Sequence, residues 1–135
     1  MISSGSVRTL TPETRDLIEA RLRAVIANVA ATFGATVALR YTRNYPVTCN
    51  HAAEAAFAAK AAADIVGAAA VDSNRSPVMF GEDFAYMLEA RPGAFIYIGN
   101  GNTNGLHNPA YDFNDEIIPF GCSYWVRIVE AAMPA

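Results

Sequence analysis

Apolar side chains recur every three or four residues through the segment 12–33, and charged residues hold the opposite side. This spacing predicts an amphipathic helix over residues 12–33. Thr11 is a good residue to cap its start, and Pro12 suits the first helical position because the missing N–H has no partner there. Gly34 is expected to end the helix. The apolar positions are Leu17, Ile18, Leu22, Val25, Ile26, Val29 and Phe33.

Shorter segments with β-branched or alternating residues predict strands at 5–10, 36–41, 70–71 and 94–98. The segment 94–98 is apolar throughout, which is typical of a strand buried on both faces. The sequence therefore predicts a strand, a long helix and a strand over residues 1–45, which is one half of a small open-faced sandwich.

Three further helices are expected in the remainder of the chain. An Ala-rich helix at about 51–66 would be capped by Asn50 and closed by Gly67. Its alanines suggest close packing against a neighbour, with an isolated helix as the alternative. A second helix opens at residues 81–83 and ends at 91–93, and a last one covers 113–133. Alternating strands and helices predict an α/β or mixed α+β fold.

The composition and charge of the chain exclude several classes of function. The chain has 135 residues, a formal net charge of −3 and a single lysine, so no basic stripe for nucleic acid is present. Two cysteines exclude a disulfide scaffold, and the longest apolar run, 52–63, is interrupted by Glu54 and Lys60 and predicts no membrane span. With no targeting signal recognised, a cytoplasmic location is expected. Two histidines cannot complete a site that needs several imidazoles.

Several polar residues have both a structural and a functional interpretation. His107 lies in a Gly/Asn-rich loop, where a histidine is usually idle but can also bind a metal. Arg8 is either a solvated strand residue or a fork for a carboxylate. Glu82 and Asp83 either complement a helix dipole or form the wall of a substrate site. The glycines after residue 98 depart from a dinucleotide-binding fingerprint, because no helix follows them.

Several motifs, taken in order, resemble the hippurate hydrolase and indoleacetyl-amino-acid hydrolase branch of the aminoacylase–carboxypeptidase metallopeptidase superfamily. They span nearly the whole chain, which makes the resemblance specific. The motifs are GSVRTL at 5–10, PETRDLIE at 12–19, YPVTCNH at 45–51, MFGEDFAYML at 79–88, IGNG at 98–101, LHNPAYDFND at 106–115 and SYW at 123–125.

The resemblance implies half of a ferredoxin-like lid or dimerisation domain at 1–45, followed by the C-terminal part of an α/β metallopeptidase-type catalytic domain at 46–135. It implies hydrolysis of N-acyl amino acids by two divalent ions (Zn, Mn, Co or Ni) bridged by water, with a Glu as general base. His107 falls on the last metal ligand, and Arg8 matches an arginine that contacts the substrate carboxylate.

The segment 80–83 would border the substrate pocket through Phe80, Gly81 and Glu82. Relatives usually read Gly-Ser-Glu-Asp there, whereas this chain has Phe-Gly-Glu-Asp. A bulky Phe80 replaces a glycine that lets backbone approach the ligand, so the shape of the pocket is expected to differ.

The family's other metal ligands and its general base belong to motifs that these 135 residues do not contain. No catalytic residue is therefore assigned, and the chain alone is expected to be inactive and not to hold metal stably. The alternatives are a non-catalytic, self-associating remnant or a subunit completed by a separate N-terminal chain. Bare strand edges further predict a homo-oligomer.

Overall fold

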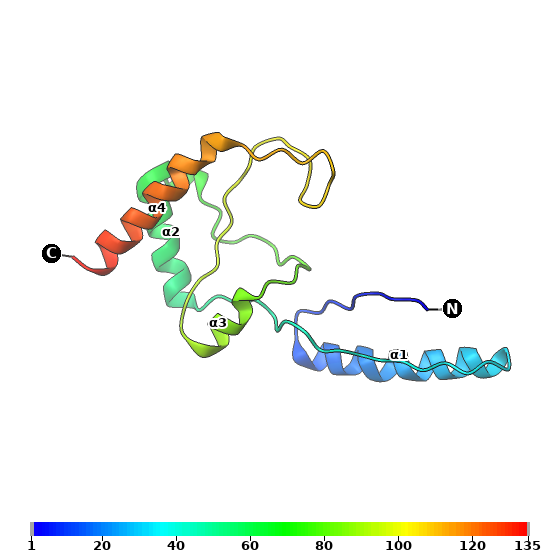
Figure 1. Ribbon diagram of the computed structural model, residues 1–135. Helices are drawn as coiled ribbons and strands as arrows, with labels where there is room; N and C mark the ends of the chain where they lie inside the picture. Colours follow the sequence, from blue (N-terminus) through cyan, green and yellow to red (C-terminus); the bar gives the residue numbers. More distant parts are fainter. Residues whose placement is uncertain (1, 135) are drawn as a thin grey trace. The chain divides into compact units, whose positions relative to one another are not determined.

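The computed structural model describes residues 2–134 and is helical in this part of the chain (Figure 1). Its α-helices are α1 (Pro12–Thr32), α2 (Ala52–Val66), α3 (Phe84–Ala90) and α4 (Ile118–Ala132), with 3₁₀ turns η1 (Ala68–Ala70) and η2 (Asp115–Ile117). The chain divides into two compact units. Unit 1 comprises residues 1–49 and 76–91, and unit 2 comprises residues 50–75 and 92–135.

Helix α1 begins where the sequence predicts. The Thr11 hydroxyl accepts a hydrogen bond from the Thr14 N–H at 3.1 Å, which satisfies one of the free donors of the first turn. Pro12 occupies the first helical position. The predicted cap is therefore confirmed.

The end of α1 is a glycine-dependent turn. The Ala35 N–H reaches back to the Ala30 carbonyl at 2.9 Å, and the Gly34 N–H donates to the Ala31 carbonyl at 3.1 Å. Gly34 has φ +62°, a left-handed conformation that suits a residue without Cβ. This pair of bonds is the Schellman arrangement, and Gly34 ends the helix as predicted.

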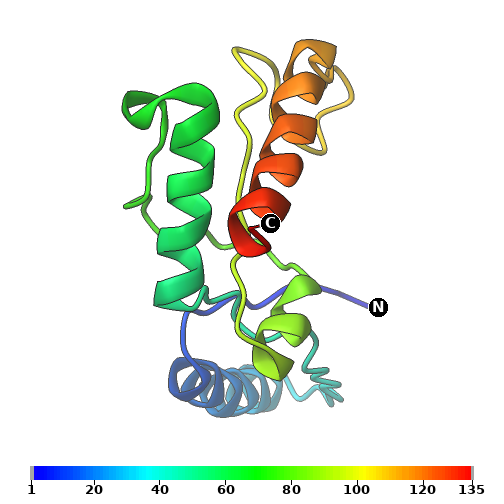
Figure 2. The same ribbon diagram turned by 90° about the vertical axis from the view of Figure 1, so that its left-hand side faces the viewer.

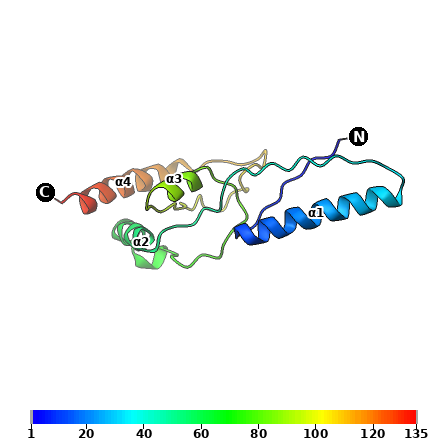
Figure 3. The same cartoon turned by 90° about the horizontal axis from the view of Figure 1, so that it is seen from below.

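Within unit 1, the chain after α1 returns along the helix (Figure 3). The Arg43 guanidinium holds it there through ion pairs of 2.7 Å to both Asp16 and Glu19. Arg23, one turn after Glu19, binds the other oxygen of the same carboxylate at 2.7 Å. Side-chain charges, not backbone pairing, thus attach this segment to α1.

Unit 2 is built on the packing of α2 against α4 (Figure 2). Ala58 and Ala61 of α2 and Tyr124 of α4 are its buried residues among those described. Small side chains let the helices approach closely, so the close-packing interpretation of the Ala-rich helix is confirmed. Arg127 of α4 also pairs with Asp64 of α2 at 2.7 Å.

The residues just before α2 hold the segment 93–95 by four hydrogen bonds. The Asn50 side chain donates to the Phe95 carbonyl and accepts from the Phe95 N–H, both at 2.8 Å. The His51 N–H donates to the Gly93 carbonyl at 3.1 Å, and the Gly93 N–H donates to His51 Nδ1 at 3.2 Å. The cap position of α2 is His51, so the prediction that Asn50 caps the helix is wrong.

No strand forms among residues 2–134, so the mixed α+β prediction is not confirmed. A strand needs a second segment to complete its hydrogen-bond ladder, and the segments 5–10, 36–41 and 94–98 lie irregularly instead. Ala70 belongs to η1, which makes the strand predicted at 70–71 wrong. The last helix begins at Ile118, because η2 precedes it and Pro119 occupies its first turn.

None of the helices in the described residues is long and apolar enough to cross a membrane.

Candidate functional site

Two of the predicted substrate-binding residues lie against each other in unit 1. The Arg8 guanidinium lies directly over the α-carbon of Gly81: a Cβ built there would be 2.8 Å from Arg8 Nη1 and 3.8 Å from Cζ. Real Cβ atoms essentially never approach so closely, so any other residue at position 81 would have to displace the guanidinium. Gly81 therefore provides the space that Arg8 occupies.

Two tyrosines that the sequence reasoning did not assign to the site lie beside this pair. Tyr45 Cδ2 would be 3.3 Å from the same Cβ on Gly81, so the ring and the guanidinium share one side of the glycine. Tyr86 of α3 packs edge-on against Tyr45, with ring centroids 6.0 Å apart and planes at 70°. Both tyrosines lie inside the quoted motifs, at 45–51 and 79–88, and that position is the sequence signal that could have identified them.

The Arg8 side chain is exposed, and no carboxylate within residues 2–134 forms an ion pair with it. A guanidinium offers five N–H donors in a planar fork that matches the two oxygens of a carboxylate. The arrangement can therefore bind a carboxylate ligand without first breaking an internal salt bridge.

Phe80 and Glu82, the other two predicted residues, flank Gly81 in the chain. Phe80 is exposed. Glu82 is half-buried, and its Oε1 accepts a hydrogen bond from the Phe84 N–H at 3.2 Å. Because Phe84 is the first residue of α3, Glu82 satisfies a free donor at the helix start. This contact favours the helix-start reading of Glu82.

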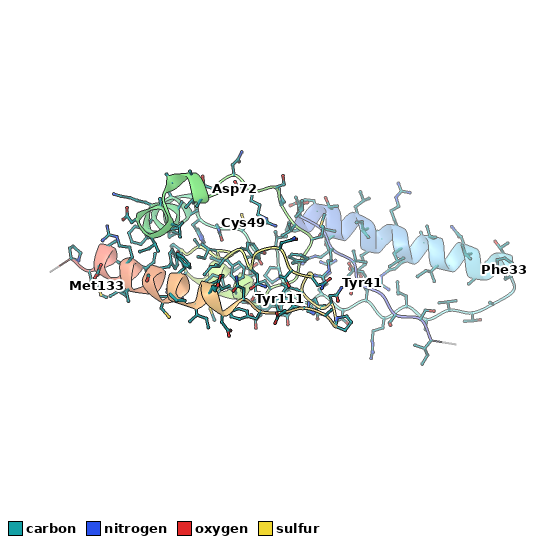
Figure 4. The ribbon with its side chains drawn as sticks, turned by 90° about the horizontal axis from the view of Figure 1, so that it is seen from above. Phe33, Tyr41, Cys49, Asp72, Tyr111 and Met133 are labelled. Atoms are coloured by element: carbon teal, nitrogen blue, oxygen red, sulfur yellow. The ribbon has the colours of Figure 1, made fainter. Side chains whose placement is uncertain are left out.

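His107 lies in unit 2, in a loop closed by side chains. Asn100 donates to the Asp112 carbonyl and accepts from the Asn114 N–H, each at 2.8 Å. Nearer the tip, Asn104 donates to the Ala110 carbonyl at 3.0 Å. Figure 4 labels Tyr111 on the returning limb, whose N–H donates to the Asn108 carbonyl at 2.9 Å.

The backbone of His107 is left-handed, with φ +68°, and its side chain is exposed. Non-glycine residues adopt this conformation at a cost and keep it where surrounding bonds determine it. Hydrogen bonds from the side chains of Asn100, Thr103 and Asn104 cross the loop on either side of His107. The Gly/Asn-rich loop predicted from the sequence is thus crossed by hydrogen bonds of its own side chains.

A family model for "Peptidase family M20/M25/M40" matches residues 4–131. The chain belongs to this family. The family resemblance drawn from the motifs is therefore confirmed.

Relatives within the M20 family carry names that describe hydrolases and deacetylases. The chain is 30% identical over 123 residues to the hippurate hydrolase of Campylobacter jejuni, a match covering 91% of this chain and 32% of that protein. It is 28% identical to the N-acetyldiaminopimelate deacetylase of Shouchella clausii over 130 residues (96% and 34%). It is 31% identical to the N-acetylcysteine deacetylase of Bacillus subtilis over 124 residues (92% and 32%).

The chain thus spans about a third of the length of the curated relatives it matches. No solved structure matches it.

The donors present do not make up the paired metal site that resemblance to this M20 branch implies. Within the described part of the chain, no group of three or more His, Cys, Asp or Glu side chains could hold a metal ion. His107 is one donor, and His51 Nδ1 already accepts the Gly93 N–H. The thiols of Cys49 and Cys122 are exposed and form no disulfide. A dinuclear site does not fit these residues alone.

A groove of about 340 Å³ runs beside α2 and α4 in unit 2. It combines apolar carbon from Phe57 with the Asp64–Arg127 ion pair, and none of the predicted site residues lines it. The complete lining is Phe57, Lys60, Ala61, Asp64, Arg127, Glu130, Ala131 and Pro134.

Proposed function

We propose that this chain is part of a metal-dependent amidohydrolase that hydrolyses N-acyl amino acids, and that Arg8 binds the carboxylate of the substrate. Membership of the M20 family supports the reaction class. The names of three relatives, a hippurate hydrolase and two deacetylases of N-acetylated amino acids, support the substrate class. The position of the Arg8 guanidinium over Gly81 is the observation that carries the role of Arg8.

The remaining site assignments follow from the same proposal. His107 contributes one ligand to the metal pair, and the closed loop of residues 100–114 holds its backbone. Residues 1–45 form part of a lid domain, and residues 46–135 form the C-terminal part of a catalytic domain. When bound, the divalent metal supplies Lewis acidity and an activated water. Arg8, beside Gly81, binds and orients the substrate through its carboxylate. A cytoplasmic location remains a prediction.

Carboxylate binding is tested by NMR titration of the purified chain with N-acetylglycine and with the neutral N-acetylglycinamide. The acid is expected to shift resonances of Arg8 and Gly81 and to bind at least threefold more tightly than the amide, because an exposed charge-assisted contact contributes about 1 kcal/mol. Arg8→Gln is expected to remove that preference. Arg21→Gln, an exposed arginine on α1, is the matched control. Equal binding of acid and amide by the unmodified chain would contradict the proposal.

A second candidate is a self-associating protein or a subunit completed by another chain. One apolar stripe along α1 and its C-cap favours it: Val25 is 57% exposed, Val29 53% and the C-cap residue Phe33 80% (Figure 4). Such a stripe is typical of a covered face. Light scattering is expected to show a homo-oligomer that Val25→Glu dissociates, and a monodisperse monomer at working concentration would contradict this.

A further inference from the structure

The tyrosines beside Arg8 are exposed aromatic surface next to an unpaired cation. Tyr45 is 52% exposed and Tyr86 50% exposed. Their edge-on packing fixes each ring against the other, and Tyr45 lies within 3.3 Å of the Gly81 Cβ position that Arg8 Nη1 also approaches. A ligand bound to the guanidinium would therefore lie next to the aromatic ring of Tyr45.

We infer that Tyr45 and Tyr86 form an aromatic wall that selects the amino-acid side chain of the substrate, so that this site takes N-acyl amino acids with an aromatic or large apolar side chain. The inference rests on the proposed role of Arg8 in binding the carboxylate. It extends that proposal from the carboxylate of the substrate to its amino-acid side chain.

The connectivity of the substrate decides which group reaches the wall. In an N-acyl amino acid, the α-carbon is bonded directly to the carboxyl carbon, and the side chain leaves from that α-carbon. The acyl carbonyl carbon is separated from the carboxyl carbon by the α-carbon and the nitrogen. With Arg8 holding the carboxylate, the amino-acid side chain therefore starts one bond nearer to Arg8, and to Tyr45 beside it, than the acyl carbon does.

The geometry of the pair suits an aromatic guest. Aromatic rings prefer edge-to-face or offset contacts with centroids about 4.5–7 Å apart, and the Tyr45–Tyr86 pair already has this relation at 6.0 Å. A third ring can extend the cluster on the exposed half of either tyrosine, with its apolar surface removed from water.

The test compares dissociation constants measured by NMR titration of the intact chain. The ligands are N-acetylglycine, N-acetyl-L-phenylalanine, N-benzoylglycine and N-acetyl-L-phenylalaninamide. N-acetyl-L-phenylalanine is expected to bind about three- to tenfold more tightly than N-acetylglycine, in line with the usual strength of aromatic contacts. N-benzoylglycine is expected to gain less, because its ring is on the acyl side.

Variants assign the preference to the wall. Tyr45→Ala and Tyr86→Ala are expected to reduce the ratio of the N-acetylglycine dissociation constant to that of N-acetyl-L-phenylalanine, and Tyr45→Phe is expected to keep that ratio. Tyr97→Ala is the matched control, since Tyr97 is also exposed and packs edge-on against Phe95 in unit 2. Amide spectra of each variant report whether it is folded, and Tyr86→Ala carries the test if Tyr45→Ala is not folded.

The outcomes separate this inference from the proposal beneath it. If Arg8 does not bind carboxylates, the acid and the amide of N-acetylphenylalanine bind alike. If Arg8 binds them but the wall does not select, N-acetylglycine and N-acetyl-L-phenylalanine bind equally and the tyrosine variants change neither. A gain confined to N-benzoylglycine would overturn the assignment to the amino-acid side chain.

Discussion

At the scale of single residues, the proposed role of Arg8 depends on its contact with Gly81. The backbone conformation of position 81 does not require a glycine, because Gly81 is not among the described glycines with a positive φ. The absence of a side chain at position 81 matters only for the space above it. The glycine therefore acts through Arg8, as a positioning residue.

Gly81→Ala is expected to weaken carboxylate binding by about three- to tenfold, because its methyl group would displace a guanidinium whose exposed ionic contact contributes about 1 kcal/mol. The measurement is the N-acetylglycine dissociation constant. Gly5→Ala is the matched control, since a Cβ there meets nothing within 4 Å. In Arg8→Gln the additional Gly81→Ala change is expected to have no further effect, and an additive loss would refute the positioning role.

At the scale of elements, Glu19 joins α1 to the segment that follows it. Hydrogen bonds from Arg23 and then from Arg43 lower the pKa of Glu19 below its ordinary value of 4.5. The hydrogen bond to Glu19, followed by the charge of Asp16, raises the pKa of Arg43. One carboxylate thus links two parts of unit 1 in the absence of a backbone ladder.

The lowered pKa of Glu19 predicts a loss of stability in acid. A carboxyl whose folded pKa lies below its unfolded value stabilises the fold above the unfolded value, and this contribution disappears as the pH falls through the lower, folded value. Urea unfolding from pH 6 to pH 2 is expected to show a shallower acid loss in Glu19→Gln than in the unmodified chain. High salt is expected to reduce the difference, because exposed ion pairs are screened. Identical pH profiles would refute the role of Glu19.

The Asn50 clamp on Phe95 is a second element-scale contact that carries a prediction. Asn50→Ala removes two hydrogen bonds of 2.8 Å and is expected to lower the free energy of unfolding by about 1–2 kcal/mol. Asn50→Asp is the matched variant, since its carboxylate can still accept the Phe95 N–H but cannot donate to the Phe95 carbonyl. Hydrogen exchange at the Phe95 amide is the measurement: it is expected to accelerate in Asn50→Ala and less so in Asn50→Asp. Unchanged exchange in both would contradict the clamp.

Local features were predictable from the sequence, whereas features that need a distant partner were not. The cap at Thr11 and the stop at Gly34 depend on residues within one turn, and both predictions are confirmed. The segment 94–98 has a strand-like sequence, but it forms no strand within residues 2–134. The Phe95 backbone bonds to the Asn50 side chain instead. The motifs indicated the family without indicating that Tyr45 and Tyr86 would pack together.

At the scale of the whole molecule, metal chemistry requires more donors than residues 2–134 bring together. A site with two metal ions needs several imidazole and carboxylate ligands on one cavity, and the described residues hold no such group of three or more. The proposed carboxylate binding needs only Arg8 beside Gly81, and both residues belong to unit 1. We therefore expect this chain to bind the substrate carboxylate without providing the metal site that hydrolysis needs.

The purified 135-residue chain is expected to bind N-acetyl amino acids but not to hydrolyse them. After incubation with Zn²⁺, Mn²⁺, Co²⁺ or Ni²⁺ and dialysis, metal analysis is expected to find no tightly held pair of ions, and hippurate is expected to remain intact. The hippurate hydrolase of Campylobacter jejuni, assayed in parallel, shows that the conditions support the reaction. Hydrolysis that rises with the concentration of this chain and stops on chelation would contradict the prediction. It would also mean that His107 finds its fellow ligands within these residues, since a single imidazole cannot hold two ions.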